Sequence, residues 1–269
     1  MSIEDLRFTP GLLSRPVPRG LAAETTLQHF VIVTYWVDPS NLRKHLHPRF
    51  EPACLGAEGK PRRALVSVVT FLDRDFRFVA CPWITRSFGQ TNYRAYVQDT
   101  ETGEQAAWFF GTCLDSVSVA VPRHLWKLPW HRARMAFDCR YDAAAARYST
   151  FIVRTRSSWA PAHLEIKDGG RPPSQLSGVS NLEAGLVLLT HPMRGYFFRR
   201  DGDLGSYKIW HDRTEPTVGE VLDAKYPILQ RLELVPEGDR ENIHSVLLQP
   251  SIDFTIYLPP SRVHSGVVG

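Results

Sequence analysis

Residues 92–114 of this 269-residue chain read NYRAYVQDTETGEQAAWFFGTCL, and this stretch decides the fold. Its first part alternates in the way that strands do, so its side chains fall into two sets on opposite faces. These sets are Tyr93, Ala95 and Val97 on one face, and Asn92, Arg94 and Tyr96 on the other. The polar turn at 100–103 leads to a second strand-like segment at 105–114. The pattern therefore predicts a β-hairpin.

Segments of the same kind surround this hairpin along the chain. Apolar, aromatic and β-branched runs predict further strands at 27–37, 64–76, 132–141, 147–156, 195–200, 205–211, 228–235, 243–248 and 252–258. Short helices are expected at 41–47, 115–126, 181–190 and 218–224. About ten strands without a βαβ alternation predict a mainly β, α+β fold, in which one antiparallel sheet forms a single closed β-barrel with a few short helices.

One domain is the simplest division of the chain. Residues 1–24 are rich in proline, arginine and glycine, and Pro10, Pro16 and Pro18 argue against a helix there. We therefore expect an N-terminal extended arm at 1–24, packed on the body or on a partner subunit. The barrel domain is expected at 25–262, followed by a C-terminal tail at 263–269.

The composition is that of a soluble globular protein, with 43% hydrophobic and 22% charged residues. The net charge is +4, but the basic residues form no run, so we expect no nucleic-acid partner. No apolar run approaches the roughly 18 residues of a membrane span, so we expect no membrane partner. The four cysteines contain no CxxC pair, which indicates a reduced, cytoplasmic protein.

Motifs for the common cofactors and metals are missing from the sequence. It contains no GxGxxG, GxxxxGK[ST], GxSxG or HExxH pattern, so we expect no cofactor and no metal. The charged cluster Asp73-Arg74-Asp75 stands at the end of a predicted strand, and we interpret it as a solvated turn. The remaining partner class is a small-molecule substrate or ligand, and a homo-oligomer is possible.

Residues on both sides of the hairpin resemble a known family. They are Trp36-Val37-Asp38-Pro39, Asn92-Tyr93-Arg94-Ala95-Tyr96-Val97, Ala107-Trp108-Phe109-Phe110, Leu114-Asp115, Arg123 with Leu128-Pro129-Trp130, and the later Leu189-Thr190, Tyr196, Arg199, Asp201-Gly202 and His211. Their order and spacing resemble the YqjF-like family, a domain-of-unknown-function family in the acetoacetate decarboxylase-like superfamily. The resemblance covers about residues 27–260. It implies a closed, cone-like β-barrel with a central cavity.

The same resemblance draws attention to a missing lysine. In the decarboxylases of that superfamily, an arginine stands six residues before a proline, and a lysine pair follows the proline. Here Arg123 and Pro129 keep this spacing, but Trp130 and His131 occupy the two positions that follow. Tryptophan cannot form a Schiff base, so classical decarboxylation is not expected. Only Lys208 lies in the middle of a predicted strand, where it is either exposed or a relocated Schiff-base amine.

Several residues are candidates for substrate binding. Arg94 shares a strand face with Asn92 and Tyr96, and an arginine that points into a barrel costs several kcal/mol unless it is paired. Arg94 therefore clamps a substrate carboxylate, forms an internal salt bridge to a residue such as Asp115, or lies on a solvated face. Arg123 orients an anion or fastens its own helix, whereas Trp130 is expected to shape the cavity wall.

Candidates for proton transfer are the two histidines at family positions. His131 replaces the lost lysine, and His211 lies where the family pattern has a histidine. A histidine with a pKa near neutrality can act as a general acid or base. The alternative for His131 is a loop histidine that is hydrogen-bonded to backbone. Tyr196 lies where the family pattern is polar and aromatic, and we include it among the substrate-binding candidates.

Three functions remain open on this basis. The leading hypothesis is a lyase, dehydratase or isomerase that acts on an anionic, carbonyl-bearing substrate by acid–base chemistry. The second is a barrel that binds a ligand without chemistry, which a purely apolar cavity and exposed histidines would favour. The third is a structural or interaction protein, which a barrel filled by side chains would favour.

Overall fold

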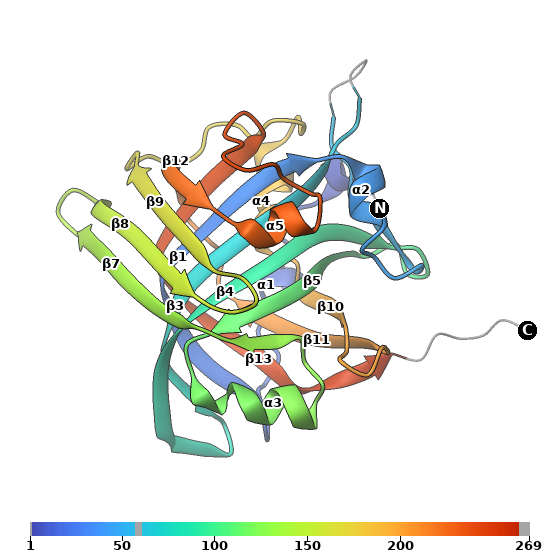
Figure 1. Cartoon of the computed structure of the whole chain (residues 1–269), viewed down its shortest axis with the longest axis vertical. Helices are drawn as coiled ribbons and strands as arrows, with labels where there is room; N and C mark the ends of the chain where they lie inside the picture. The colour runs from blue at the N-terminus through green and yellow to red at the C-terminus, as the bar shows by residue number, and fades with distance from the viewer. Residues whose placement is uncertain (1, 57–60, 264–269) are drawn as a thin grey trace, which may run out of the picture.

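A ring of paired strands forms the centre of the computed structural model, which describes residues 2–56 and 61–263 (Figure 1). The ring contains β1 (Ala23–Val37), β3 (Ala64–Phe78), β4 (Cys81–Asp99), β5 (Gln105–Leu114), β10 (Arg194–Phe198), β11 (Leu204–His211) and β13 (Ile243–Val263). Neighbouring strands pair in this order, and β13 pairs again with β1. All these pairs are antiparallel except β5 with β10, which is parallel. The fold is therefore mainly β.

A second group of strands extends from β13. It runs through β12 (Thr217–Lys225), β9 (Ala162–Asp168), β8 (Arg147–Arg156) and β7 (Arg134–Asp142) in antiparallel order. The extension packs on one face of the ring, where Val31 and Val33 of β1 share a buried apolar cluster with Phe151 and Val153 of β8. Two short strands complete the sheet, β2 (Phe50–Pro52) on β4 and β6 (Trp130–Arg132) on β5.

The opposite face of the ring strands packs against a helix. Leu27 and Ile32 of β1 belong to a second buried cluster that contains Val187 and Leu188 of α4 (Leu182–Thr190). The side chain of Asn181 caps this helix, accepting a hydrogen bond from the backbone N–H of Glu183. Because the ring strands are buried on both faces, the sequences of β1, β3 and β5 contain nearly continuous apolar runs, whereas β4 alternates.

The remaining helices are short. They are η1 (Ile3–Asp5), α1 (Pro10–Leu13), α2 (Pro39–Arg43), η2 (Val117–Val119), α3 (Ala120–Leu125) and α5 (Pro227–Arg231). Within residues 2–56 and 61–263, none of the helices has the length and apolar character needed to cross a membrane.

Several expected elements agree with the structure and others do not. The strands predicted at 105–114 and 147–156 are confirmed as β5 and β8. The helix predicted at 218–224 is wrong, because this segment pairs with β9 and β13 as strand β12. The strand predicted at 228–235 is also wrong, because Pro227 occupies the first turn of α5. The single helix predicted at 115–126 is divided into η2 and α3.

The N-terminal arm packs on the body, and it contains two short helices that its prolines did not predict. Pro10 is accommodated in the first turn of α1, where a backbone N–H is not needed. The backbone N–H of Phe8 donates to Glu183 at 3.0 Å, and the indole of Trp210 donates to the carbonyl of Leu13 at 3.0 Å. Of the predicted tail at 263–269, Val263 ends β13 and residues 264–269 lie outside the described residues.

A buried ion pair fastens the end of β4. The carboxylate of Asp99 is fully buried, and Arg49 donates to it from Nε at 2.8 Å and from Nη2 at 2.6 Å. Burial alone would raise the pKa of Asp99, but the hydrogen bonds and charge of Arg49 outweigh it, so the pKa is lowered. The pair therefore stabilises the fold above the unfolded carboxyl pKa of about 3.9.

Asp99→Asn is expected to lower the free energy of unfolding by about 2–3 kcal/mol at pH 7, because it removes the buried counter-charge of Arg49 and leaves this arginine paired only with the half-exposed Glu101, at 2.7 Å. The difference should shrink as the pH falls through the lowered pKa of Asp99, where the wild-type carboxylate is also protonated. Urea unfolding of the wild type and the variant at pH 7 and at acidic pH measures the loss of stability and its dependence on pH. Glu51→Gln is the control, because Glu51 is exposed and pairs with Arg43 at 3.3 Å; it should change stability by less than about 1 kcal/mol. Equal losses for the two variants would contradict the prediction.

Candidate functional site

A pocket of about 260 Å³ lies on the inner face of the ring, close to the lower end of the size range of ligand sites. Residues of β1, β3, β4, β5, β11 and β13 form its walls, and η2, α3 and Trp130 cover one side. Most of the lining is apolar and aromatic. The polar lining residues include Asp73, Gln90, Asn92, Arg94, Thr190, Tyr207 and His211.

Arg94 is the buried cation of the pocket. Its side chain is 5% exposed, and only its Nη2 atom donates, to the carbonyl of Leu189 at 2.7 Å and to the hydroxyl of Tyr96 at 3.4 Å. Its Nε atom is buried, and no described residue forms a hydrogen bond with it. Among the residues that the structure describes, no carboxylate lies within ion-pair distance of Arg94. The predicted alternative of an internal salt bridge to Asp115 does not occur, since Asp115 accepts from the backbone of Met135.

The C-terminal end of α4 partly compensates this charge. Leu189 and Thr190 belong to the last turn, whose carbonyls have no partner within the helix. Arg94 and Tyr96 both donate to the carbonyl of Leu189, the latter at 3.0 Å. A helix C-terminus carries about half a negative charge, so it favours a nearby cation without neutralising it.

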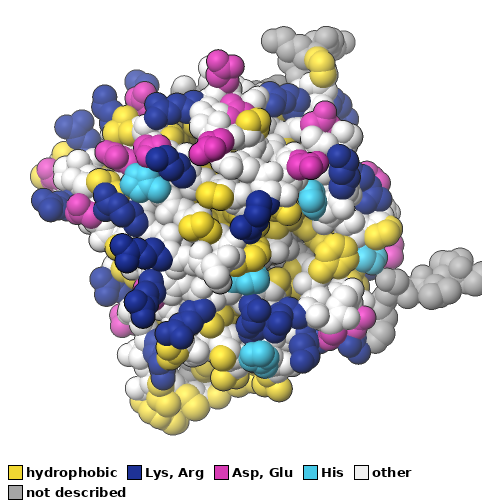
Figure 2. All heavy atoms as spheres, in the orientation of Figure 1, with side chains coloured by type: hydrophobic (Ala, Val, Ile, Leu, Met, Phe, Trp, Pro, Cys, Tyr) yellow, Lys and Arg dark blue, Asp and Glu magenta, His cyan; other side chains and the backbone are white. Residues whose placement is uncertain are grey.

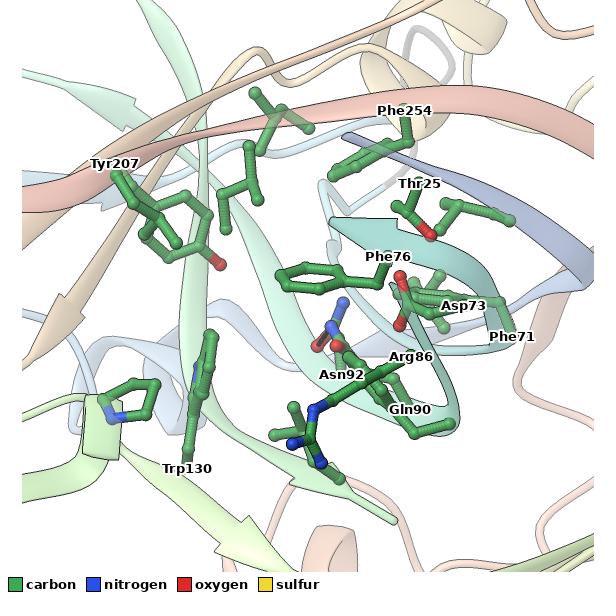
Figure 3. Close-up of a pocket in the computed structure, with 18 of the residues that line it drawn as sticks. Thr25, Phe71, Asp73, Phe76, Arg86, Gln90, Asn92, Trp130, Tyr207 and Phe254 are labelled. Carbon is green, nitrogen blue, oxygen red and sulfur yellow. Dashed lines mark hydrogen bonds between the residues drawn. The ribbon is translucent and has the colours of Figure 1, made fainter. Parts of the chain in front are cut away.

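Two further donors face the same space (Figure 3). The hydroxyl of Tyr207 points into the pocket and makes no hydrogen bond with another described residue. Burial raises the pKa of Tyr207, so the hydroxyl keeps its proton. The amide of Asn92 also points inward, and its Oδ1 atom already accepts from Thr112 at 2.8 Å and from Gln90 at 2.9 Å. The Asn92 NH₂ group is therefore oriented as a donor.

Close packing fixes the position of Tyr207. Its ring lies against Phe109 and Phe197, with centroid distances of 5.5 and 5.6 Å. Gly195 is the cross-strand partner of Tyr207, and a Cβ atom added there would lie 2.6 Å from Phe109 and 3.2 Å from Tyr207. The absence of a side chain at Gly195 thus allows both rings to reach the pocket wall.

His211 lines the pocket, as predicted for a site residue, but its ring is already engaged. Nε2 lies 2.8 Å from the carbonyl of Thr190, and Nδ1 lies 2.7 Å from the carbonyl of Asp212. Burial lowers the pKa of His211, and the nearby charge of Arg94 lowers it further. Neither nitrogen is free to meet a molecule in the pocket in this arrangement.

His131 does not line the pocket. It stacks on Trp159 with a centroid distance of 4.1 Å, and its Nδ1 atom accepts a hydrogen bond from Arg123 at 3.2 Å. Burial, with the charges of Arg123 and Arg200, lowers the pKa of His131 to about 4. The structure thus separates this histidine from Arg94, and the role that the sequence predicted for it is not supported by its position.

Of Trp130 and Arg123, only Trp130 is among the described residues that line the pocket. Trp130 lines the pocket, on one wall in Figure 3, as the sequence predicted. Arg123 does not belong to the lining; it donates to the backbone carbonyl of Trp130 and to His131. This contact corresponds to the structural alternative for Arg123, in which the arginine fastens its own segment.

Two predicted tyrosines lie away from the pocket. Tyr96 is fully buried between Arg94 and Ser67, whose hydroxyl lies 2.8 Å from its own. Tyr196 packs on Phe50 with a centroid distance of 4.6 Å, and its hydroxyl lies 3.5 Å from Asp99. Neither tyrosine lines the pocket, although Tyr96 helps to hold Arg94 in place.

Asp73 is a pocket residue that the sequence interpretation missed. The prediction of a solvated turn is wrong for this residue, because β3 continues beyond it and its side chain is 3% exposed. Its Oδ2 atom has no hydrogen-bond partner among the described residues. Burial raises the pKa of Asp73 to about 7, outweighing the opposite effect of the Thr25 side chain. The predicted strand at 64–76 contained the signal, since Val69, Phe71 and Asp73 follow a period of two and all three line the pocket.

No lysine is found among the described residues that line the pocket. Lys208, which was considered as a relocated amine, is exposed on β11 while its neighbours Tyr207 and Ile209 line the pocket. Lys208 therefore corresponds to the alternative of an exposed strand lysine. Lys60 lies outside the described residues.

Hydrophobic side chains also gather outside the pocket. Figure 2 shows them at the lower end of the molecule, where Figure 1 places the hairpin of β3 and β4. Ile84 and Arg86 of this hairpin line the pocket and are themselves exposed, so the hairpin forms part of the pocket rim.

Comparisons with known proteins agree with this architecture. A model of the family DUF2071, described as an uncharacterized conserved protein, matches residues 24–252. No curated protein sequence matches the chain. An acetoacetate decarboxylase from Legionella pneumophila is structurally similar, with a TM-score of 0.57 and 15% identity over 96% of each chain.

Two other solved structures are similar at comparable levels. An acetoacetate decarboxylase-like enzyme from Sphingomonas wittichii RW1 has a TM-score of 0.58 and 11% identity, over 92% of this chain and 95% of that chain. The enduracididine biosynthesis enzyme MppR, complexed with pyruvate, has a TM-score of 0.56 and 14% identity, over 93% of this chain and 92% of that one. At these identities the likeness establishes an acetoacetate decarboxylase-like fold and nothing more.

Proposed function

The chain belongs to the DUF2071 family, and we propose that its pocket binds a small, mainly apolar molecule with a carboxylate and a carbonyl group and acts on it by proton transfer. The reaction class would be a lyase, dehydratase or isomerase step. We also propose that the ring of strands is a closed, cone-like barrel with the pocket as its lumen. The pairing of β13, the last strand of the ring, with β1, the first, supports a closed barrel.

One observation carries the proposal, which is the buried Arg94 without a carboxylate partner among the described residues. An isolated charge in an apolar environment is costly unless it is paired and hydrogen-bonded. The end of α4 supplies only about half a counter-charge. A ligand carboxylate would supply the rest, and the planar guanidinium is suited to it.

The other donors suit a carbonyl group. Tyr207 and Asn92 can donate hydrogen bonds to a carbonyl oxygen, where they would stabilise the negative charge of an enolate. The proton from the neighbouring carbon would pass to a ring nitrogen of His211, which would have to give up one of its contacts with a backbone carbonyl to accept it. The pyruvate of the MppR complex is a 2-oxo acid, a molecule of this class, and it supports the proposal by analogy of fold. The absence of lysine from the described lining supports a mechanism without a Schiff base.

A second candidate function is binding of the same ligand without chemistry. It is favoured by His211, because both ring nitrogens face backbone carbonyls and no other histidine lines the pocket among the described residues. The two functions differ in one measurable property. A catalyst should accelerate the exchange of the C3 protons of a bound 2-oxo acid, which lie next to its carbonyl, with D₂O. A carrier should slow this exchange.

The proposal is tested with phenylpyruvate and phenylacetone, which share a skeleton but differ by the carboxylate. Calorimetry should show that phenylpyruvate binds about ten- to a hundredfold more tightly, which is the contribution expected for hydrogen bonds to a charged group. Proton NMR in D₂O then reports exchange against a protein-free sample. Equal affinities for the two molecules would contradict the anion site, and unchanged exchange with tight binding would favour the carrier.

A further inference from the structure

The pocket has a second uncompensated polar group, which the proposed function does not use. Asp73 is 3% exposed and lines the pocket, and within residues 2–56 and 61–263 its Oδ2 atom has no hydrogen-bond partner. Among the described residues, no cationic side chain lies within ion-pair distance of Asp73. A buried oxygen of this kind costs free energy unless a donor reaches it.

Asp73 and Arg94 lie at different ends of the pocket. In the pairing of β3 with β4, Arg94 is opposite Ser67, and the register runs without a shift from there to Asp73 opposite Phe88. Six residues of strand separate Ser67 from Asp73, which corresponds to about 20 Å along β3. Arg94 also leans away from Asp73, towards Tyr96 and the end of α4.

The space between these two ends is mainly apolar along β3 and β13, while Gln90 and Asn92 of β4 are its polar side chains. Val69 and Phe71 follow the inner face of β3 between Ser67 and Asp73, and Ile252 and Phe254 face the pocket from β13. The aromatic ring of Phe76 lies beside Asp73 in Figure 3. A second full charge brought into these surroundings would pay a large desolvation cost, so a neutral donor suits Asp73 better than an ammonium group.

We propose that Asp73 is a second ligand-binding residue, which accepts a hydrogen bond from a hydroxyl group at the end of the ligand remote from its carboxylate. This inference rests on the proposed function and narrows its substrate class. The ligand would be an elongated hydroxy acid, with its carboxylate on Arg94, an apolar middle along β3 and β13, and its hydroxyl on Asp73.

The test uses straight-chain carboxylates from hexanoate to dodecanoate, each with and without a terminal hydroxyl, and calorimetry with the full chain. Because the two ends of the pocket are fixed, the hydroxyl should improve affinity about tenfold at a matched chain length and much less at other lengths. Asp73→Leu should abolish this preference. Asp73→Asn keeps an acceptor oxygen of the same shape, so it should keep most of the preference.

Binding of the unsubstituted acids serves as the folding control for both variants, because it needs Arg94 and not Asp73. The inference is overturned if the hydroxyl brings no gain at any length in the wild type, or if Asp73→Leu keeps the gain. Carboxylates with a terminal amino group in place of the hydroxyl are measured as well. If they bind more tightly than the hydroxy acids of the same length, the assignment of a neutral donor is overturned. If no carboxylate binds at all, the proposed function itself fails; if carboxylates bind regardless of the hydroxyl, only the inference on Asp73 fails.

Discussion

Replacing Arg94 by methionine is expected to stabilise the ligand-free protein while it removes the affinity for carboxylates. Methionine fills a similar apolar volume without a charge, so it removes a buried cation that the described residues compensate only in part. The carbonyl of Leu189 keeps one donor, the hydroxyl of Tyr96 at 3.0 Å. The change therefore leaves no new unsatisfied acceptor at the end of α4.

The expected gain in the free energy of unfolding is about 1–2 kcal/mol, at the lower end of the range for replacing buried charges by apolar side chains. The affinity for phenylpyruvate should fall about a hundredfold, as the charge-assisted hydrogen bonds are lost. Urea unfolding and calorimetry on the same preparations measure the two effects. Most pocket substitutions would lower both stability and affinity, so opposite signs are diagnostic of a binding residue.

Arg194→Met is the matched control. Arg194 lies half-exposed on β10; its Nε atom is 3.9 Å from Glu104, and its Nη1 atom makes a long hydrogen bond of 3.4 Å to the hydroxyl of Tyr196. This substitution should change stability by no more than about 0.5 kcal/mol and leave the affinity unchanged. If Arg94→Met instead lowers stability and leaves carboxylate binding intact, Arg94 is a structural residue that fastens β4 to α4.

The part of the site that the sequence could predict is the part that depends on local alternation. Tyr93 and Ala95 belong to the buried cluster that the ring shares with β8, whereas Asn92 and Arg94 line the pocket, as the period of two indicated. The same rule explains the position of His131. Trp130 precedes it on β6 and lines the pocket, so His131 points to the opposite side, against Trp159.

The part that could not be predicted depends on contacts between distant segments. The segment 217–225 has a mixed pattern, and its strand conformation follows from pairing with β9 and β13. Asp73 stands among charged residues that are typical of a turn, and its burial depends on β3 and β4 continuing as a long hairpin beyond it. The charges next to Asp73 in the sequence cannot reveal this burial, because it depends on pairing with Phe88 of β4 and with Leu27 of β1.

The wild-type protein is expected to lose stability as the pH rises from about 4 to about 7, and Asp73→Asn is expected to remove this loss. Burial raises the pKa of Asp73 to about 7, against about 3.9 in the unfolded chain. Between these values the folded protein binds more protons than the unfolded protein, so the free energy of unfolding decreases as the pH rises. At 1.36 kcal/mol for each pKa unit, the loss for this group is at most about 4 kcal/mol and is complete above pH 7.

Urea unfolding of the wild type and of Asp73→Asn across pH 4.5 to 8 measures this difference, which should grow with pH in favour of the variant. Asp75→Asn is the control, because Asp75 is exposed and has a positive φ of 53°, which asparagine tolerates. Its effect should be small at every pH. Parallel stability curves for Asp73→Asn and the wild type would contradict the prediction.

A bound hydroxy acid should also change the pKa of Asp73 and with it the pH dependence of stability. A hydroxyl that donates to Asp73 favours the ionised carboxylate, so it should lower the pKa of Asp73 towards its usual range. Stabilisation of the wild type by a matched ω-hydroxy acid should then be larger at pH 8 than at pH 5, beyond the mass-action effect of the unsubstituted acid. In Asp73→Asn the two acids should stabilise the protein with the same pH dependence, because asparagine has no proton to release.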